Sequence, residues 1–514
     1  MWQPTNTPEQ DRARKLSELQ ERGVQPYPNR VSRTHTAREA VSAYEMAEAT
    51  HPDAPAPLTV TICGRIVRQN LKGKVFFAHI EDGSGRVQLF VRIDRVGEET
   101  FELVRRHLDL GDFVQARGTM MRTRAGEVSV LVDELALLAK ALSPLPVIKE
   151  RVAEDGSMER YGAFSDVEER YRQRYADLAV NPDSREVFRK RAQTVSALRR
   201  FLDGEGFLEV ETPILQPIYG GAAARPFVTH HNQLHQDLYL RISFELYLKR
   251  LLVGMYDAVY EIGRDFRNEG VSFKHNPEFT QLEFYQAYTD YHGMMGLTER
   301  MIAYVAEQVT GSTTISFEGQ TINLAPPWQR ITLREAVRQQ AGIDYANHPD
   351  ARSLYAAMKA AGLPASPTAT WGKLVDTLLG DTVEPSLIQP TFILDYPRDI
   401  SPLAKTKPGD PTHVERFEIF VGGMEMGNAF TELNDPLDQE ARFLEMGRLY
   451  AAGDEEATPM DEDYLRAMRY GMPPCGGCGV GVDRLVMLLT DRSTIREVLL
   501  FPHLRERQGE RSQS

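Results

Sequence analysis

Hydrophobic and polar positions divide the chain into two parts of different texture. Residues 58–139 contain short apolar or alternating runs, separated by glycines at turn-like positions. About five strands in about 80 residues are typical of a small Greek-key barrel such as an OB-fold, and a small β-sandwich is the alternative. From residue 166 onward the runs are longer, and residues 185–203 place apolar side chains at helical spacing. The pattern predicts an α+β multidomain protein with an N-terminal β-barrel.

The remaining segments suggest where the domains begin and end. Residues 147–165 carry proline, glycine and charge without a sustained apolar period, and we predict a linker there. The last residues, 508–514, are predicted to be a frayed tail. We therefore expect an N-terminal helix and barrel within residues 1–146 and a second, larger domain over residues 166–507.

Composition and charge narrow the class of protein. Hydrophobic residues make up 42% and charged residues 26% of the 514 residues, as in ordinary globular proteins. No apolar run approaches the roughly 20 residues of a membrane helix, so we expect no membrane contact. Three cysteines provide no disulfide framework, which favours a cytoplasmic location. The net charge of −13 discourages nonspecific polyanion binding but does not exclude a nucleic acid that binds a local patch.

Two alternating runs predict the strands of a hairpin. Period two places Arg267 and Glu269 on one face of residues 258–269. In residues 278–288, one face carries polar and aromatic side chains: Phe279, Gln281, Glu283 and Tyr285. Such a face suits a zwitterion and a nucleotide, because a guanidinium binds two oxygens and an aromatic ring can stack on a base. A solvated surface loop between the strands is the alternative.

A glycine-rich strand entering a helix is predicted over residues 477–491. Gly479 and Gly481 leave room for close backbone approach, and Arg484 falls in the first turn of the helix. The pattern is neither GxGxxG nor a P-loop, so close strand packing remains the alternative.

A third strand pair, residues 417–435, combines carboxylates with polar side chains. Glu418 and Glu425 could bind Mg²⁺, a hard cation that prefers oxygen ligands. Strict alternation places Glu425 on the face opposite Asn428, so a bulge near Gly427 is needed to bring both into one site. Solvated charge on an edge strand is the alternative. The face of Asn428 also carries Phe430 and Glu432.

Two further patterns do not predict metal sites. Cys475 and Cys478 have C-x-x-C spacing, but only Cys63 could add a thiol, and it lies in the distant barrel. The adjacent histidines of residues 229–232 would point to opposite faces of a strand.

Taken together, these segments resemble the class II lysyl-tRNA synthetases of the bacterial type, from the N-terminus to about residue 505. Residues 206–215 resemble motif 1, residues 266–288 motif 2 and residues 479–484 motif 3. Motif 2, together with residues 220–232 and 387–396, is close to diagnostic of the family. The class I HIGH and KMSKS signatures are absent. The resemblance implies an antiparallel sheet flanked by helices, and ATP-dependent transfer of L-lysine to tRNA(Lys) through a lysyl-adenylate.

The resemblance also implies roles for the ATP-binding residues. Arg267 would contact the α-phosphate and the lysine carboxylate, Glu269 the adenine amino group and His275 the outer phosphates. Phe279 and Arg484 would sandwich the adenine, and Arg267 and Arg484 would be the catalytic residues. The full set for ATP would be Arg267, Glu269, His275, Asn276, Phe279, Glu418 and Arg484.

For lysine, the resemblance assigns two groups of contacts. Gly221 and Glu245 would bind the α-ammonium, and Asn428 the carboxylate. Glu432 and Tyr285 would hold the ε-ammonium. Glu283 and Phe430 complete the set, and Glu418 and Glu425 would bind Mg²⁺ together with ATP.

The barrel resembles the anticodon-binding domain of that family. Arg65, Phe77 and Gln88 match its base-stacking and base-reading positions. Core packing is the alternative for Phe77, and one of the adjacent rings Phe76 and Phe77 should be exposed. Motif 1 implies a homodimer, with residues 185–203 and the strand leading to Pro213 at the interface. Two departures from the family, Cys478 and the long linker, touch no predicted contact.

Three other interpretations compete with this one. Aspartyl- or asparaginyl-tRNA synthetases share the architecture, but Glu432 would be a carboxylate that binds an ammonium and so suits lysine, whereas aspartate would call for a cationic pocket. A shortened paralogue that modifies a protein lysine would lack the barrel. A catalytically inactive OB-type RNA-binding protein would not need the set Arg267, Glu418, Glu425 and Arg484.

Overall fold

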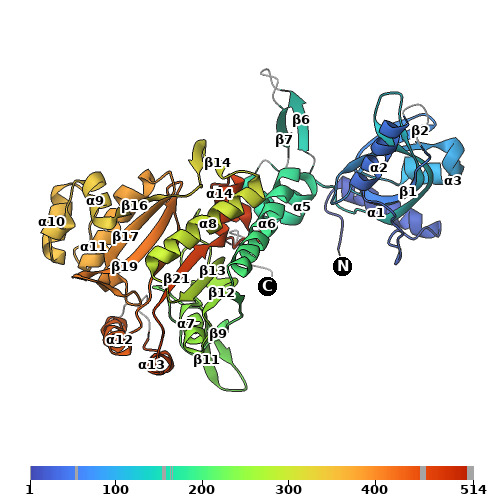
Figure 1. Cartoon of the computed structure of the whole chain (residues 1–514). Coiled ribbons are helices and arrows are strands. Elements are labelled where there is room, and N and C mark those ends of the chain that lie inside the picture. The colour runs from blue at the N-terminus through green and yellow to red at the C-terminus, as the bar shows by residue number, and fades with distance from the viewer. Residues whose placement is uncertain are drawn as a thin grey trace. The chain divides into compact units, whose positions relative to one another are not determined.

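The computed structural model describes residues 2–51, 56–146, 148–152, 158–162, 164, 166–451 and 459–505. It divides into two compact units, Met1–Asp166 and Val167–Ser514 (Figure 1). In the described residues, no helix is long and apolar enough to cross a membrane. The predicted α+β multidomain class is confirmed: one unit is built on a β-barrel and the other on a large, mostly antiparallel sheet.

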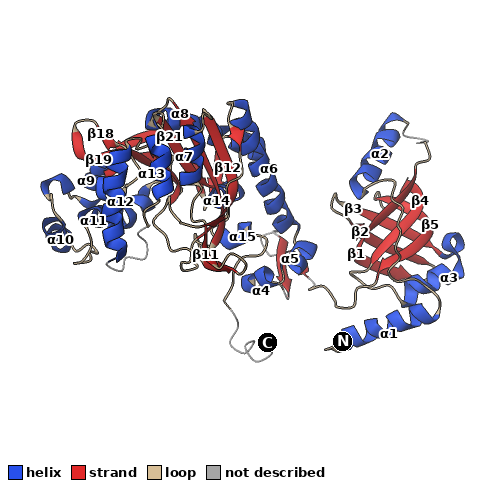
Figure 2. Cartoon of the chain, turned by 90° about the horizontal axis from the view of Figure 1, so that it is seen from below, coloured by secondary structure: helices blue, strands red, loops and turns tan. Residues whose placement is uncertain are grey.

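The first unit contains a closed five-stranded barrel with strand order β1-β2-β3-β5-β4 (Figure 2). The barrel alternative is therefore correct, and the sandwich alternative is wrong. Three helices accompany it. The strands and helices are β1 (Thr59–Lys72), β2 (Val75–Glu81), β3 (Arg86–Arg92), β4 (Phe113–Arg122), β5 (Val128–Ala139), α1 (Thr7–Glu21), α2 (Ala37–Thr50) and α3 (Ile93–Arg106).

Alternation along the strands builds the barrel core. On β2, Phe76, Ala78 and Ile80 are buried, while Phe77 between them is partly exposed. Strand β4 needs a glycine where it approaches β5 closely, because a Cβ on Gly118 would lie 2.0 Å from the Leu131 carbonyl oxygen. These contacts explain why short alternating runs punctuated by glycine close into a barrel.

A buried ion network lies at the edge of the barrel core. The Lys140 side chain is fully buried, and its Nζ donates to Asp109 at 2.5 Å and to Asp112 at 2.8 Å. The Asp109 carboxylate also accepts from Lys15 at 2.8 Å. Burying an ammonium is tolerated here because two carboxylates compensate its lost hydration.

The second unit is organised around a sheet with the strand order β16-β17-β19-β20-β21-β13-β12-β8. Pairing is antiparallel through the centre and parallel at the two edges, β16–β17 and β8–β12. The short strand β18 pairs with β19. The strands are β8 (Leu208–Glu209), β12 (Ala258–Phe266), β13 (Glu278–Ala287), β16 (Gln329–Thr332), β17 (Thr391–Pro397), β18 (Thr406–Lys407), β19 (Asp410–Val421), β20 (Met424–Thr431) and β21 (Cys475–Gly481).

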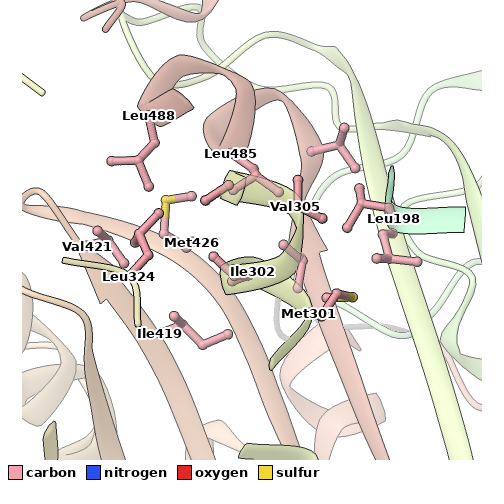
Figure 3. Close-up of a cluster of buried hydrophobic side chains, with 14 of the residues drawn as sticks. Leu198, Met301, Ile302, Val305, Leu324, Ile419, Val421, Met426, Leu485 and Leu488 are labelled. Carbon is pink, nitrogen blue, oxygen red and sulfur yellow. The ribbon is translucent and has the colours of Figure 1, made fainter. Parts of the chain in front are cut away.

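Helices cover both faces of this sheet. On one face, α6 (Pro182–Gly204), α8 (Tyr291–Thr310) and α14 (Val482–Thr490) form an apolar core with the sheet. This core includes Leu198, Ile302, Leu485 and Met426 (Figure 3). A second core packs other helices against Val259, Tyr285 and Phe430. Those helices are α7 (Glu245–Val253), α9 (Leu333–Ala341), α10 (Ala351–Ala360), α11 (Trp371–Leu378), α12 (Pro436–Ala451) and α13 (Glu462–Arg469).

Smaller elements complete the unit. Residues 185–203, predicted to be helical, lie within α6. The remaining elements are α4 (Val167–Arg172), α5 (Arg174–Val180), α15 (Ile495–Val498), β9 (Leu215–Gln216), β10 (Val228–His231), β11 (Gln236–Leu240), β14 (Thr314–Phe317), β15 (Gln320–Asn323), and the short helical turns η1 (Tyr345–Asn347), η2 (Leu379–Val383), η3 (Glu384–Ser386) and η4 (Arg398–Ile400).

The segment that we predicted as a linker contains regular structure. Strands β6 (Ile148–Val152) and β7 (Met158–Gly162) pair as an antiparallel hairpin, labelled in Figure 1. The sequence did not predict this hairpin. Two strands can pair through their backbones without a buried face, and such a pair leaves no apolar period to detect. Residues 147, 153–157, 163 and 165 of that segment, and the predicted tail 508–514, lie outside the described residues.

Candidate active site

A cavity of about 410 Å³ lies in the second unit. Strands β13, β20 and β21 contribute to its wall, together with the loop after β12 and the residues around the start of α7. Most of the side chains singled out in the sequence line it: Gly221, Glu245, Arg267, Glu269, His275, Asn276, Phe279, Glu283, Tyr285, Glu425, Asn428, Phe430 and Arg484. Glu418 and Glu432 do not line it. Residues of motif 2, motif 3 and the strand pair 417–435 therefore line one cavity, whereas motif 1 contributes none, and Glu418 and Glu432 need separate description.

The predicted hairpin is present, but its first strand is shorter than expected. Strand β12 ends at Phe266, so Arg267 and Glu269 lie in the following loop rather than on a strand face. The loop is closed where the Arg267 N–H donates to the Pro277 carbonyl at 2.9 Å. On β13, alternation holds as predicted: Phe279 lines the cavity and Leu282 is in the core.

The cationic end of the cavity consists of Arg267, His275 and Arg484. The Arg267 guanidinium lies 5.1 Å from the centre of the Phe279 ring, and its buried Nε has no hydrogen-bond partner among the described residues. Arg484, from the first turn of α14, donates to the Glu425 carboxylate at 3.2 Å and lies 3.3 Å from His275 Nε2. Burial, and then the Arg484 charge, lower the pKa of His275. This end offers unsatisfied cationic donors beside an aromatic ring.

The predicted bulge in β20 is confirmed. Ile419 pairs with Gly427 and the next residue, Phe420, pairs with Glu425, so Met426 is the extra residue on β20. Gly427 is required there, because a Cβ would meet the Gly479 carbonyl oxygen at 2.4 Å. The bulge turns both Glu425 and Asn428 toward the cavity.

Arg416, which the sequence reasoning missed, orients Asn428. The Arg416 Nε donates to Asn428 Oδ1 at 2.9 Å. Because a guanidinium has only donors, the atom facing it must be the amide oxygen, and the NH₂ of Asn428 remains for an acceptor in the cavity. The signal was available: Arg416 precedes Glu418 by two positions and therefore shares its strand face.

Glu418 lies behind the cavity wall. Its carboxylate accepts from Arg416 at 2.6 Å and from the Tyr396 hydroxyl at 2.9 Å. Burial raises the pKa of Glu418 to about 7; the Arg416 charge opposes this rise and the Glu425 charge adds to it. No group of three or more His, Cys, Asp or Glu able to hold a metal is found in the described part of the chain. Two carboxylates nevertheless fit Mg²⁺, which takes one or two from the protein when phosphates and water supply the rest.

The acidic end of the cavity is lined by Glu245 and Glu283, and Glu432 lies buried behind it. Glu283 is buried and accepts from the Ser243 hydroxyl at 2.7 Å and from the Tyr285 hydroxyl at 3.1 Å. Burial, and then the Glu245 charge, raise the pKa of Glu283 to about 7. The wall also needs Gly221, which has φ of 90° and where a Cβ would lie 2.8 Å from Ser243 Oγ.

Glu432 is 1% exposed and pairs with a second residue that the sequence reasoning missed, Lys249 on α7. The Lys249 Nζ also donates to Glu245 at 2.5 Å. Glu432 Oε1 has no hydrogen-bond partner among the described residues. It lies directly behind Gly477 of β21, where a Cβ would meet it at 2.2 Å and would meet the Tyr285 ring at 2.3 Å. The acidic end therefore has a buried, unsatisfied oxygen directly behind a position that only a glycine can occupy.

The cysteine and histidine patterns hold no metal in the described part of the chain. Cys475 and Cys478 are free thiols, and they belong to different apolar cores on the two faces of the sheet. Burial raises the pKa of Cys478 to about 12. His230 is exposed and pairs with Asp237 at 2.7 Å.

Of the candidate residues of the barrel, Arg65 and Phe77 are partly exposed, whereas Gln88 is buried. Phe77 and Phe90 stack with ring centres 4.9 Å apart, while Phe76 is buried, so one of the adjacent rings is exposed as predicted. Gln88 accepts from the Ser129 hydroxyl at 2.8 Å. Arg65 pairs in register with Glu81, which is four residues, or about 13 Å, along β2 from Phe77. Its guanidinium lies 4.3 Å from the Phe113 ring centre.

Comparison with known proteins covers both units. The family described as tRNA synthetases class II (D, K and N) matches residues 166–505, and the OB-fold nucleic acid binding domain matches residues 60–138. Three similar proteins are each named lysine–tRNA ligase. That of Chloroflexus aurantiacus is 54% identical over 97% of this chain and 98% of its own length. That of Roseiflexus castenholzii is 54% identical over 98% and 99%, and that of Pelotomaculum thermopropionicum is 51% identical over 97% and 94%.

Proposed function

The chain belongs to the lysine–tRNA ligases, a family of class II tRNA synthetases, and from this premise we propose how its cavity works. The enzyme activates L-lysine with ATP and transfers the lysyl group to the 3′ end of tRNA(Lys). The observation that carries the assignment of the cavity is its division into a cationic end and an acidic end, since the substrates are a polyphosphate and a diammonium.

ATP binds at the cationic end. Phe279 and Arg484 enclose the adenine, and the exposed Glu269 at the rim accepts from its amino group. Arg267 binds the α-phosphate, which satisfies the guanidinium nitrogen that now lacks a partner. His275 and Asn276 lie on the loop beside it and contact the outer phosphates.

Lysine binds at the acidic end. Its α-ammonium meets Glu245 and the backbone at Gly221, and its carboxylate meets the NH₂ of Asn428, which Arg416 directs into the cavity. The methylenes lie against Phe430. The ε-ammonium reaches Glu432 Oε1, the Tyr285 hydroxyl and Glu283, where the orphan oxygen gains the donor that it lacks.

In the first step the lysine carboxylate oxygen attacks the α-phosphorus, and the bond to the bridging oxygen of pyrophosphate breaks. In the second step a ribose hydroxyl of the terminal adenosine attacks the lysyl carbonyl, and AMP leaves. No nucleophile from the protein is needed, so positioning and charge stabilisation by Arg267 and Arg484 supply the rate. This explains why the cavity is lined by binding groups rather than by a triad.

Glu418 and Glu425 are the residues that would hold Mg²⁺. When bound, the ion would neutralise charge on the phosphates. The Arg416 and Tyr396 contacts leave lone pairs on both Glu418 oxygens, and Glu425 already faces the cavity, so the donor set fits a hard cation.

The rival interpretations are weaker. The matching family covers aspartate, lysine and asparagine enzymes alike, so it does not decide among them. The buried carboxylates Glu245, Glu283 and Glu432 disfavour aspartate, because they would repel its side chain, and the similar proteins named lysine–tRNA ligase support lysine over asparagine. A shortened paralogue is disfavoured by the intact barrel. An inactive protein is disfavoured by the presence of Arg267, Glu425 and Arg484 around one cavity.

The barrel binds the anticodon in this proposal, and residues 1–146 and 166–507 act as separate domains on either side of the 147–165 segment. The partly exposed stack of Phe77 on Phe90 supports base stacking. Arg65 and Gln88 contact bases on the same surface. Three free cysteines fit a reducing cytoplasm.

We further propose a homodimer that uses motif 1. Four large apolar side chains near the β8 edge of the sheet are between 45% and 62% exposed in the single chain: Leu208, Ile214, Leu215 and Val228. Burying them between two copies would remove that apolar surface from water. Sedimentation at micromolar concentration should give a dimer, and a stable species of 58.1 kDa would contradict it.

The proposed function is tested by amino-acid-dependent exchange of pyrophosphate into ATP, measured with all twenty amino acids. Lysine should support exchange, and aspartate and asparagine should not. Exchange with aspartate or asparagine instead would identify one of the rivals, and no exchange with any amino acid would indicate an inactive protein.

A further inference from the structure

We propose that Lys249 sets the separation of the two ammonium-binding carboxylates and thereby the length of side chain that the enzyme accepts. This inference rests on the proposed placement of lysine at the acidic end. Lys249 lines no part of the cavity, and so it touches no substrate and acts as a positioning residue.

The geometry carries the inference. One nitrogen, Lys249 Nζ, forms ion pairs with Glu245 on its own helix and with Glu432, which follows β20. Two oxygens bonded to one nitrogen can be no more than about 6 Å apart, so the ammonium holds the two carboxylates at a fixed spacing. Those carboxylates are the ones assigned to the α-ammonium and the ε-ammonium of the substrate. The spacing that Lys249 imposes on the two carboxylates therefore sets the distance between the two substrate nitrogens that the site accepts.

The residues packed around Lys249 hold its side chain in place. The Lys249 side chain is fully buried, with the Phe430 ring centre 5.3 Å from Nζ. The other groups that face it are Tyr464 of α13 and Cys475 of β21, both buried. Burial lowers the pKa of Lys249, but the charges of Glu245 and Glu432 outweigh that effect and raise it well above its usual value. The side chain is therefore a permanent cation.

The formal charges give a second, independent reason. When all three are ionised, as with lysine bound, Glu245, Glu283 and Glu432 supply three negative charges, and Lys249 offsets one. The two that remain equal the two ammonium groups that lysine brings. Without Lys249 the site would hold an extra uncompensated carboxylate, which would take up a proton or move toward the substrate.

Ornithine keeps both ammonium groups and is one methylene shorter than lysine. It therefore tests directly whether Lys249 makes the site select for side-chain length. In Lys249→Met the side chain keeps its approximate length and loses its charge, and the two carboxylates are free to shift. We expect the ratio of kcat/KM for lysine to that for ornithine, measured by pyrophosphate exchange, to fall at least about tenfold. The KM for ATP should change by less than about twofold.

Lys140→Met is the matched control. Lys140 is equally buried and also bonds two carboxylates, but it belongs to the barrel unit and lines no part of the cavity. Its substitution should leave the lysine-to-ornithine ratio unchanged. Equal losses for lysine and ornithine in Lys249→Met, with the ratio preserved, would mean that Lys249 only supports the fold, and the inference would be wrong.

Lys249→Arg provides a second variant that retains a cation and so keeps the buried carboxylates paired if Lys249→Met does not fold. A guanidinium fork holds two carboxylates at a different separation than one nitrogen does. The lysine-to-ornithine ratio should therefore change by at least about threefold in the folded variant, and an unchanged ratio would overturn the inference. Failure of the proposed function is seen separately, as absence of lysine-dependent exchange by the unmodified protein.

Discussion

The two ends of the cavity are opposite in charge and in their access to solvent, although the same strands run through both. Along β13, Phe279 lies at the cationic end and Tyr285, six residues or about 20 Å further on, at the acidic end. The Arg484 side chain at the cationic end keeps 17% of its surface exposed, whereas Glu432 at the acidic end is 1% exposed.

The difference shows how burial decides what a charged site requires. At the cationic end, the Arg484 side chain is partly exposed, so water can compensate its charge before a phosphate binds. At the acidic end, the carboxylates are cut off from water, and an internal counter-ion is needed even before substrate arrives. Lys249 supplies it, and the orphan oxygen of Glu432 remains for the ligand.

The largest expected effect comes from removing charge at the acidic end. Glu432→Gln keeps the shape, and the lost charge leaves the ε-ammonium without full compensation. We expect lysine activation to fall at least about a hundredfold, from roughly 3 kcal/mol at 1.4 kcal/mol per decade. Binding of ATP with Mg²⁺ should be nearly unaffected. Calorimetry with each ligand alone measures both quantities.

Glu299→Gln is the matched control for that variant. Glu299 is also a buried glutamate of the second unit, and an amide oxygen could still accept from the Trp328 N–H, now 3.0 Å away. Its lysine affinity should equal that of the unmodified protein. If Glu432→Gln instead weakens ATP binding and spares lysine, then Glu432 serves the metal and Glu283 reads the ammonium.

Removing the aromatic ring at the cationic end is expected to have a smaller effect, and on ATP rather than on lysine. Phe279→Ala removes base stacking worth about 1–3 kcal/mol, so the KM for ATP should rise by about 5- to 100-fold. Lysine binding measured alone should barely change, because the ring lies at the other end of β13. Phe273→Ala, which removes a 58% exposed ring outside the cavity lining, should leave both constants unchanged. An unchanged KM for ATP in Phe279→Ala would remove it as the stacking ring.

The two ends should also differ in their response to pH. Burial raises the pKa of Glu283 to about 7, whereas burial lowers that of His275. The ammonium of lysine favours the ionised carboxylate, so lysine binding releases a proton near neutral pH and strengthens as pH rises through about 7. We expect kcat/KM for lysine to increase several-fold between about pH 6 and pH 8.

Glu283→Gln should flatten this pH dependence, whatever it does to the rate itself. The KM for ATP should vary by less than about twofold above about pH 8, because there His275 is neutral and Glu418 is ionised. A decrease of lysine kcat/KM with rising pH, or the same slope in Glu283→Gln, would show that another group controls it.

Removing the barrel is expected to have the smallest effect on the activation of lysine with ATP at the two ends of the cavity. Deleting residues 1–146 leaves every cavity-lining residue in place, so lysine-dependent pyrophosphate exchange should stay largely intact. Aminoacylation of tRNA should weaken greatly, because the anticodon contacts are lost. Loss of exchange in a folded truncated protein would show that the two units do not divide the work in this way.

Local patterns predicted much of this architecture because they depend on neighbours in sequence. Period-two alternation identified β13 and the face that carries Glu283 and Tyr285, and the conflict between Glu425 and Asn428 predicted the bulge that the structure contains. The same reasoning extended β12 too far, since alternation continues through Arg267 while pairing ends at Phe266. It also overlooked the β6–β7 hairpin, whose pairing leaves no apolar period to detect.

The sequence by itself therefore determined most of the strands, the faces they present and most of the polar groups that line the cavity. Only the tertiary structure decided how deeply each charge lies and which charge meets it. Lys249 pairs with Glu432 because α7 and the end of β20 pack together, and Arg416 is turned to Asn428 by the register of β19 on β20. A buried charge is stable only beside its partner, and that partner comes from a distant part of the chain, so periodicity cannot show it.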